Sequence, residues 1–174
     1  TGCAGNIRPW YPSDDGGFAR PTFEQLESAG QKLAEDVLFS REIRHEIKAS
    51  DIRITGAFHN LPYAELPTPN SLNTATESED IRLREWAEIM QFHLENGPLP
   101  SHCPQEIQLL RLDDSHQVIF LGGEILAEIG LRIKRSLSPI TTITCAYANG
   151  LIGYVPSEST YDLDGYEVSG SYHL

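Results

Sequence analysis

The order of periodic segments in the second half of the chain constrains its fold more than any other sequence feature. The apolar segments EIQLLRL and QVIFLG flank the polar sequence DDSH, a pattern typical of two strands joined by a turn. A helix is expected to begin near Glu124, because apolar residues follow at helical spacing at Leu126, Ile129, Ile133 and Leu137. The segment ITTITCAYA then predicts another strand. This order predicts a mixed α/β or α+β fold, in which helices flank a mixed sheet.

The first half of the chain predicts one helix and one strand. Thr22 and Gln25 have the spacing of a capping box, so we expect a helix to begin there. Its apolar face is expected to contain Phe23, Leu26, Ala29, Leu33 and Val37. The alternation in DIRITGAF predicts a strand.

A second helix is expected after a long connection. Residues 60–76 are rich in Pro, Asn and Thr, which predicts an irregular segment that is either mobile or functional. Ser78 is expected to cap the helix and Gly97 to end it. One face carries a stripe of apolar residues, Leu83, Trp86, Met90 and Leu94, which indicates core packing rather than a ligand site.

Composition excludes some classes of function. The 174 residues suit one domain or a large piece of one. The formal net charge is −12, the acidic residues are spread along the chain, and no basic cluster offsets them. We therefore expect no nucleic-acid partner, because binding to the phosphate backbone requires positive charge. The sequence contains no apolar run long enough to span a bilayer, so we expect no transmembrane segment.

Two further features concern processing and compartment. The opening TGCAGNIRPW is typical of sequence from within a domain, so we expect the true N-terminus to lie upstream of Thr1. Cys3, Cys103 and Cys145 are odd in number and lack CxxC spacing, which argues against a disulfide framework or a zinc knuckle. Unpaired cysteines favour a reducing, cytoplasmic compartment. Cys145, in an apolar segment, is expected to be a buried thiol.

Glu124 is the first candidate for chemistry. It follows Gly122 and Gly123 at an expected strand–helix junction, where glycines allow close backbone approach and a helix N-terminus favours a carboxylate. Acidic residues are also common in first helical turns because of the helix dipole alone, so a purely structural role stays open.

The tyrosines near the C-terminus are the second candidate. Tyr147, Tyr154, Tyr161 and Tyr166 lie in a Gly- and Pro-containing segment with little regular period. A phenolate can bind a metal if the ion lowers the phenol pKa from its usual value of about 10. Buried tyrosines are more often core residues whose hydroxyl has a hydrogen-bond partner. Both interpretations remain open from the residues alone.

Other catalytic motifs are missing from the sequence. The six histidines are scattered, no pair has i, i+4 spacing, and no HExxH occurs. No GxSxG serine, P-loop or dinucleotide-binding fingerprint is present. His102 lies beside Cys103, but one adjacent pair is a weak indication of a metal site.

The C-terminal motifs carry a resemblance to a known family. The segments LGGEILAEIGLRIK and ITCAYANGLIGYVPSESTYDLDGYEV resemble the neutral/alkaline non-lysosomal ceramidase family, especially its bacterial ceramidase-like relatives. That family has a PGE motif at a strand–helix junction, followed by GLANxYxxYxxTxEEY and YEGAS. The matching residues here are Gly123, Glu124, Ala148, Asn149, Gly153, Tyr154, Tyr161, Tyr166 and Glu167. GCAGNIRP resembles the family's GDxSPN region, so the resemblance covers most of the chain.

The resemblance implies a zinc enzyme. The family binds one catalytic Zn²⁺ through two histidines, a glutamate and a tyrosine, and the last two correspond to Glu124 and Tyr161, which are 161 − 124 = 37 positions apart. The metal activates water to attack the amide of an N-acyl sphingoid lipid. By this resemblance, residues 1–174 are a single domain or the C-terminal portion of a ceramidase-like catalytic domain. The two histidines would lie upstream of Thr1, so that part of the polypeptide would be needed.

The chain also departs from the family pattern. The family's catalytic serine corresponds to Arg8 and its aspartate to Asn6, so the substrate is expected to be a small-molecule or lipid amide, or an ester, rather than ceramide itself. Arg8 is interpreted either as a group that binds an anion or stabilises an oxyanion, or as a structural ion-pair partner. We place Arg8, Asn6 and Tyr166 as candidate catalytic, site-lining residues.

Two alternatives to the hydrolase remain. The chain could be a non-catalytic binding or structural protein that retains the scaffold after losing the nucleophile region. It could also be an independent small α/β domain whose tyrosines form core, in which case residues 1–174 alone would give a stable monomer without metal.

Overall fold

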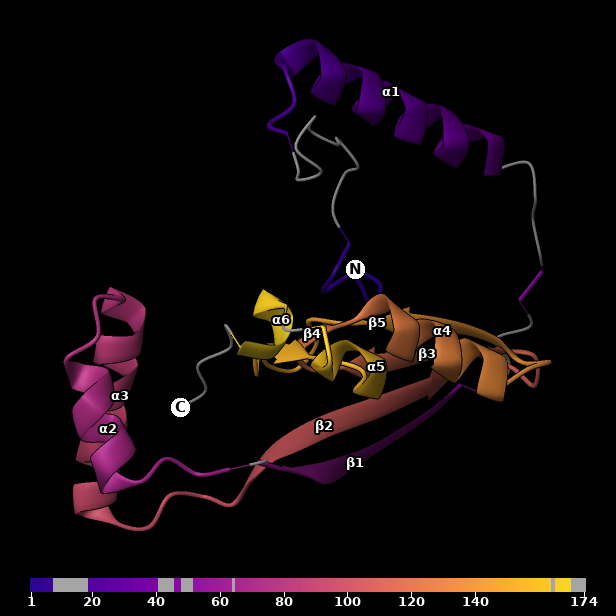
Figure 1. Ribbon diagram of the computed structural model, residues 1–174. Coiled ribbons are helices and arrows are strands. Elements are labelled where there is room, and N and C mark those ends of the chain that lie inside the picture. Colours follow the sequence, from indigo (N-terminus) through magenta and orange to yellow (C-terminus); the bar gives the residue numbers. More distant parts are fainter. Residues whose placement is uncertain (8–18, 41–45, 48–51, 64, 164, 170–174) are drawn as a thin grey trace. The chain divides into compact units, whose positions relative to one another are not determined.

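The computed structural model describes residues 1–7, 19–40, 46–47, 52–63, 65–163 and 165–169 (Figure 1). The chain divides into two compact units. One unit combines Thr1–Ile7 with Ala49–Leu174, and the other is Arg8–Lys48.

The smaller unit contains α1 (Phe23–Ser40). The expected capping box is confirmed: the backbone N–H of Thr22 donates to Gln25 Oε1 at 2.8 Å, and the N–H of Gln25 donates to Thr22 Oγ1 at 3.3 Å. These bonds satisfy two N–H groups that a helix N-terminus otherwise leaves unpaired. The apolar residues recur at the expected helical spacing, and none of them is buried.

The larger unit is built on a four-stranded sheet with the order β1-β2-β3-β5. Its strands are β1 (Arg53–Pro62), β2 (His102–Arg111), β3 (His116–Leu121) and β5 (Thr141–Cys145). The pairs β1–β2 and β2–β3 are antiparallel, and β3–β5 is parallel. The expected mixed α+β fold is therefore confirmed.

One helix, α4 (Ala127–Ser136), connects β3 to the parallel strand β5 and packs on one face of the sheet (Figure 1). The core beneath it consists of buried and partly buried apolar residues, among them Leu121, Ile125, Ala146, Ile107, Ile119, Ile129 and Ile133. A Cβ atom at Gly130 would lie 2.8 Å from Cys3 Cβ, so only glycine allows the N-terminal segment to pack this closely against α4.

The connection from residue 60 to residue 76 differs from the expected irregular segment. Strand β1 continues to Pro62, and α2 (Pro69–Thr76) follows. Thr68 and Ser71 cap α2 reciprocally: each side-chain oxygen accepts the other residue's backbone N–H, at 3.1 Å and 2.9 Å. This local capping, with Pro at the first helical position, makes a helix of a segment whose composition indicated a loop.

The next helix, α3 (Ile81–Asn96), begins later than expected. Asp80, and not Ser78, is its N-cap, because Asp80 Oδ1 accepts the N–H of Arg82 at 2.9 Å. Its C-cap is Gly97, as expected. Helices α2 and α3 pack against each other through a small core of Leu72, Ala87, Met90, Trp86 and Leu94, which confirms that the apolar stripe is structural.

Helix α4 begins later in the chain than the sequence pattern predicts. The expected helix start near Glu124 is wrong: Glu124–Ile125 forms β4, and the helix begins at Ala127. Strand β4 pairs in parallel with β6 (Tyr154–Val155), so hydrogen bonds to a distant segment hold Glu124 extended. The helix-dipole argument therefore applies to Glu128 in the first turn rather than to Glu124.

The tyrosine-rich segment contains short regular elements. After β6 come α5 (Glu158–Tyr161) and α6 (Tyr166–Ser169). No helix in the part of the chain that the structure describes is long and apolar enough to cross a membrane.

Candidate functional site

Glu124 is positioned by a glycine turn at the end of β3. Gly123 has φ of 82°, and its N–H donates to Gly150 O at 2.9 Å. The N–H of Glu124 donates to Gly153 O at 2.7 Å. A Cβ atom at Gly123 would lie 2.8 Å from Gly153 O, so the turn needs glycine both for its left-handed backbone and for space.

The N-terminal segment holds the other side of β4. The N–H of Gly5 donates to Ile125 O at 3.0 Å, and a Cβ atom at Gly5 would lie 2.5 Å from Glu124 O. The absence of a side chain at Gly5 therefore allows its backbone to lie against the backbone of Glu124. Glu124 is thus held between two segments that are distant in sequence.

Asn6 binds the start of α4. Its Oδ1 accepts the N–H of Ala127 at 3.0 Å, and its Nδ2 donates to both carboxylate oxygens of Glu128 at 3.1 Å. The N-cap residue of this helix, Leu126, provides no side-chain cap, so Asn6 supplies the missing acceptor from a remote part of the chain. These contacts give Asn6 a positioning role next to the candidate site.

Two phenol groups contact the carboxylate of Glu124, and a third contacts one of them. Tyr147 Oη donates to Glu124 Oε2 at 3.1 Å. Tyr154 lies opposite Glu124 in the β4–β6 register and hydrogen bonds both to Glu124 and to Tyr166. The rings of Tyr154 and Tyr166 meet edge to face, with centroids 5.4 Å apart and an interplanar angle of 89°. We call these four residues, Glu124, Tyr147, Tyr154 and Tyr166, the carboxylate–phenol cluster.

The cluster raises the pKa of two of its phenols. The hydrogen bond with Tyr166, together with burial and the Glu124 carboxylate, raises the pKa of Tyr154 well above its usual value. Burial and the hydrogen bond to Glu124 also raise the pKa of Tyr147. Of these hydroxyl groups, that of Tyr147 donates to the Glu124 carboxylate.

The structure brings together only part of the set of candidate residues. Tyr166 joins Glu124 in the cluster, although its side chain remains 47% exposed. Tyr161 ends α5 with 58% of its surface exposed, and among the described residues the phenol contacts of Glu124 come from Tyr147 and Tyr154. Arg8 lies outside the described residues.

Sequence reasoning did not assign specific roles to Tyr147 and Tyr154. Tyr154 matches a position of the family motif that carries no assigned function, and Tyr147 is one of several tyrosines in the same segment. The density of tyrosines in a Gly-rich segment was the available signal. The hydrogen bonds that select two of them depend on the β4–β6 pairing.

The fit to a metal ion is partial. A carboxylate and phenols are oxygen donors suited to a divalent cation, and zinc sites in proteins usually add nitrogen or sulfur ligands. Within the described ranges, no three or more His, Cys, Asp or Glu residues lie close enough to hold an ion. The described residues therefore supply oxygen ligands, and the nitrogen ligands of a zinc site would have to come from elsewhere.

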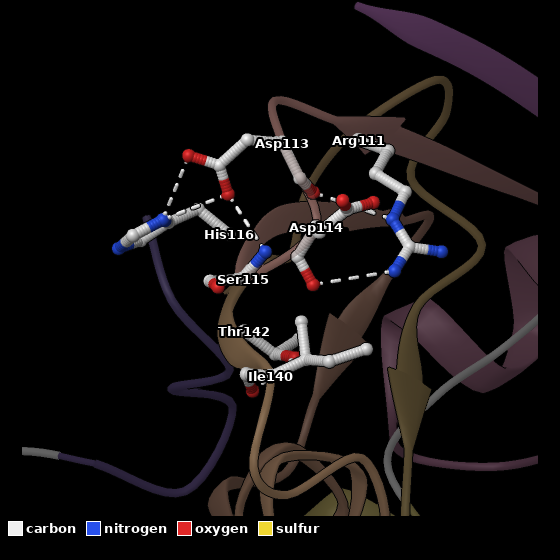
Figure 2. A network of polar contacts seen from close by, with 7 residues as sticks. All are labelled: Arg111, Asp113, Asp114, Ser115, His116, Ile140 and Thr142. Atoms are coloured by element: carbon white, nitrogen blue, oxygen red, sulfur yellow. Dashed lines mark hydrogen bonds and ion pairs between the residues drawn. The ribbon is translucent and has the colours of Figure 1, made fainter. Parts of the chain in front are cut away.

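A separate network of polar contacts lies at the β2–β3 turn (Figure 2). Asp113 Oδ1 accepts the backbone N–H of Ser115 at 2.7 Å, and the His116 ring nitrogen Nδ1 lies 2.9 Å from the same oxygen. The Ser115 N–H, followed by His116, lowers the pKa of Asp113. Arg111 donates to the carbonyls of Asp113 and Asp114, so this cluster closes the hairpin.

The cysteines form no disulfide. Cys3, Cys103 and Cys145 are all free and partly buried, so Cys145 is less buried than expected. Burial and the neighbouring Cys103 raise the pKa of Tyr63. This Tyr63–Cys103 contact lies at the far end of the β1–β2 ladder from the β2–β3 turn.

No protein-family model, curated protein or solved structure matches the chain. The resemblance to ceramidases therefore rests on the sequence motifs alone. The structure adds the mixed α+β fold and the convergence of phenols on Glu124.

Proposed function

We propose that the chain contributes the carboxylate side of the active site of a zinc-dependent hydrolase that cleaves an N-acyl amide of a small molecule or lipid. One observation carries this proposal: the glutamate in the GE motif contacts two phenols from the tyrosine-rich segment, Tyr147 and Tyr154. Two glycines that tolerate no side chain, Gly5 and Gly123, hold its backbone in place.

Glu124 and Tyr161 would hold the metal, by the motif resemblance. Tyr161 lies in sequence between Tyr154 and Tyr166, which both belong to the carboxylate–phenol cluster, and this placement supports the assignment. The two histidines that complete the site would come from polypeptide upstream of Thr1. Zinc, when bound, supplies a Lewis acid and a hydroxide near neutral pH, which is the chemistry that amide cleavage requires.

The chain's own residues would orient the reacting groups. The Glu124 carboxylate would supply negative charge to balance a cation, next to the hydroxyls of Tyr147 and Tyr154. Tyr166 lines the cluster with a partly exposed ring. We assign Arg8 to binding an anionic substrate group or a developing oxyanion.

The test is zinc content of the intact protein. We expect one tightly held zinc per wild-type chain, its loss in Glu124→Ala, and weakened binding in Tyr161→Phe, because each change removes an oxygen ligand. Glu88→Ala is the matched control, since it removes an exposed carboxylate on α3 that lies outside the cluster. Retention of full zinc content by Glu124→Ala would exclude the proposed metal site.

A non-catalytic binding protein is the second candidate. The Glu124 carboxylate already has hydrogen-bond partners among the tyrosines of its own chain, which is the observation that favours it. Hydrolysis of an N-acyl amide by the zinc-loaded protein separates the two, because a binding protein would hold the amide without releasing amine and carboxylate products.

A further inference from the structure

We infer that Tyr147 is a positioning residue for the Glu124 carboxylate, an inference that rests on the proposed metal site. Tyr147 has φ of 58°, in the left-handed region. Left-handed backbone is strained for a residue with a Cβ atom, and for a bulky aromatic residue it is a genuine outlier. Such outliers persist where the surrounding structure enforces them, and they cluster at functional sites.

The backbone around Tyr147 is held by three consecutive hydrogen bonds. The N–H of Ala146 donates to Thr1 O at 2.9 Å, that of Tyr147 to Gly123 O at 3.0 Å, and that of Ala148 to Leu121 O at 3.0 Å. These bonds attach the segment to the N-terminal residues and to the glycine turn before Glu124. The left-handed conformation is therefore over-determined by its surroundings.

The choice of tyrosine at this position needs a reason other than packing. Neighbouring left-handed positions are occupied by residues that tolerate them, namely Asn149 at 59°, Gly150 at 141° and Gly153 at 83°. Tyr147 is 43% exposed, so burial of the ring gives it only part of the usual stabilisation. What tyrosine adds over asparagine or glycine is a phenol that reaches Glu124 Oε2 at 3.1 Å.

The contact acts on the carboxylate from one side. Tyr147 approaches Glu124 from the loop after β5, while Tyr154 approaches it from β6. Groups that hydrogen bond to a metal ligand fix its orientation, and their loss typically weakens metal binding by about 10–100-fold. Tyr147 would thus hold Glu124 in the orientation that accepts the cation.

Three variants of the intact protein test this role. Tyr147→Phe keeps the ring and removes the donor, and we expect its zinc affinity, measured by competition with a chelator, to fall about 10–100-fold. Tyr147→Ala and Tyr147→Gly both remove the side chain, but only Gly relieves the left-handed strain. We expect the metal-free Gly variant to melt about 2–4 °C above the Ala variant.

The outcomes separate this inference from the proposed function. If the wild-type protein binds no zinc, the proposed metal site is wrong. A double-mutant cycle of Tyr147→Phe and Glu124→Ala in metal-free protein then tests whether the two side chains interact. Non-additive shifts in melting temperature support a carboxylate held by Tyr147. Additive shifts, an Ala variant at least as stable as the Gly variant, or unchanged zinc affinity in Tyr147→Phe would each overturn the inference.

Discussion

The carboxylate–phenol cluster and the β2–β3 turn both place a carboxylate at the centre of a hydrogen-bond network, but they are assembled differently. At the turn, Asp113 binds Ser115 and His116, which are two and three residues away (Figure 2). In the cluster, Tyr147 reaches Glu124 across 23 residues, and the backbone of Glu124 is held by segments still more distant.

The two networks therefore depend on different parts of the fold. The network at the β2–β3 turn joins near neighbours in sequence and closes the hairpin. Its hydrogen bonds need no contact with a distant segment. The cluster forms only when β4, β6 and the N-terminal segment assemble. The orientation of the Glu124 carboxylate therefore depends on the assembled fold rather than on its own neighbours in sequence.

The largest effect is expected from breaking the remote assembly at Gly5. In Gly5→Ala the new Cβ atom would lie 2.5 Å from Glu124 O, a backbone atom that cannot move aside cheaply. We expect the free energy of unfolding, from urea denaturation, to fall by about 2–3 kcal/mol. Gly56→Ala on β1 is the control, because its Cβ atom would make an ordinary 3.5 Å contact with the Gln108 side chain. Equal effects at the two positions would contradict the close approach at Gly5.

An intermediate effect is expected from Asn6. Asn6→Ala removes the acceptor for the Ala127 N–H and the donor to Glu128, so we expect the free energy of unfolding to fall by about 1 kcal/mol. Asn6→Asp keeps the acceptor but sets two carboxylates against each other. Raising the pH from 3 to 7 should therefore destabilise Asn6→Asp relative to the wild type, and a flat difference between them would argue against the Glu128 contact.

The smallest effect is expected at the hairpin turn. The folded-state pKa of Asp113 lies below its unfolded value of about 4, so its ionised form stabilises the fold above that pH. This stabilisation is lost as the pH falls through the lower, folded pKa. We expect the acid unfolding curve of Asp113→Asn to be shallower below about pH 4 than the wild-type curve. Asp114→Asn, at the exposed neighbouring position, should leave that curve unchanged.

Local sequence signals predicted much of the fold. The capping box at Thr22 and Gln25 located α1, and the alternating and apolar segments located β1, β2, β3 and β5. These signals depend on contacts within a few residues. The helix α2 was missed because its Pro, Asn and Thr residues resemble a loop, although Thr68 and Ser71 form a capping box.

The candidate site was predicted less completely. Glu124 and Tyr166 were identified as candidates, and the structure brings them into one cluster. The expected helix start near Glu124 was wrong because pairing with β6 overrides the local pattern. Tyr147 had no distinguishing sequence signal, since its role depends on a left-handed backbone that only its long-range hydrogen bonds impose.

The periodic helices and strands, the negative net charge and the tyrosines near the C-terminus can all be read from the amino-acid sequence. The folded chain selects the phenols that contact Glu124 and the contacts by which the N-terminal segment holds β4 and α4. The two kinds of feature differ in the sequence range of the interactions that produce them. Helical and strand periodicity act between near neighbours, whereas the cluster depends on hydrogen bonds and close glycine contacts between segments that meet only after the chain has folded.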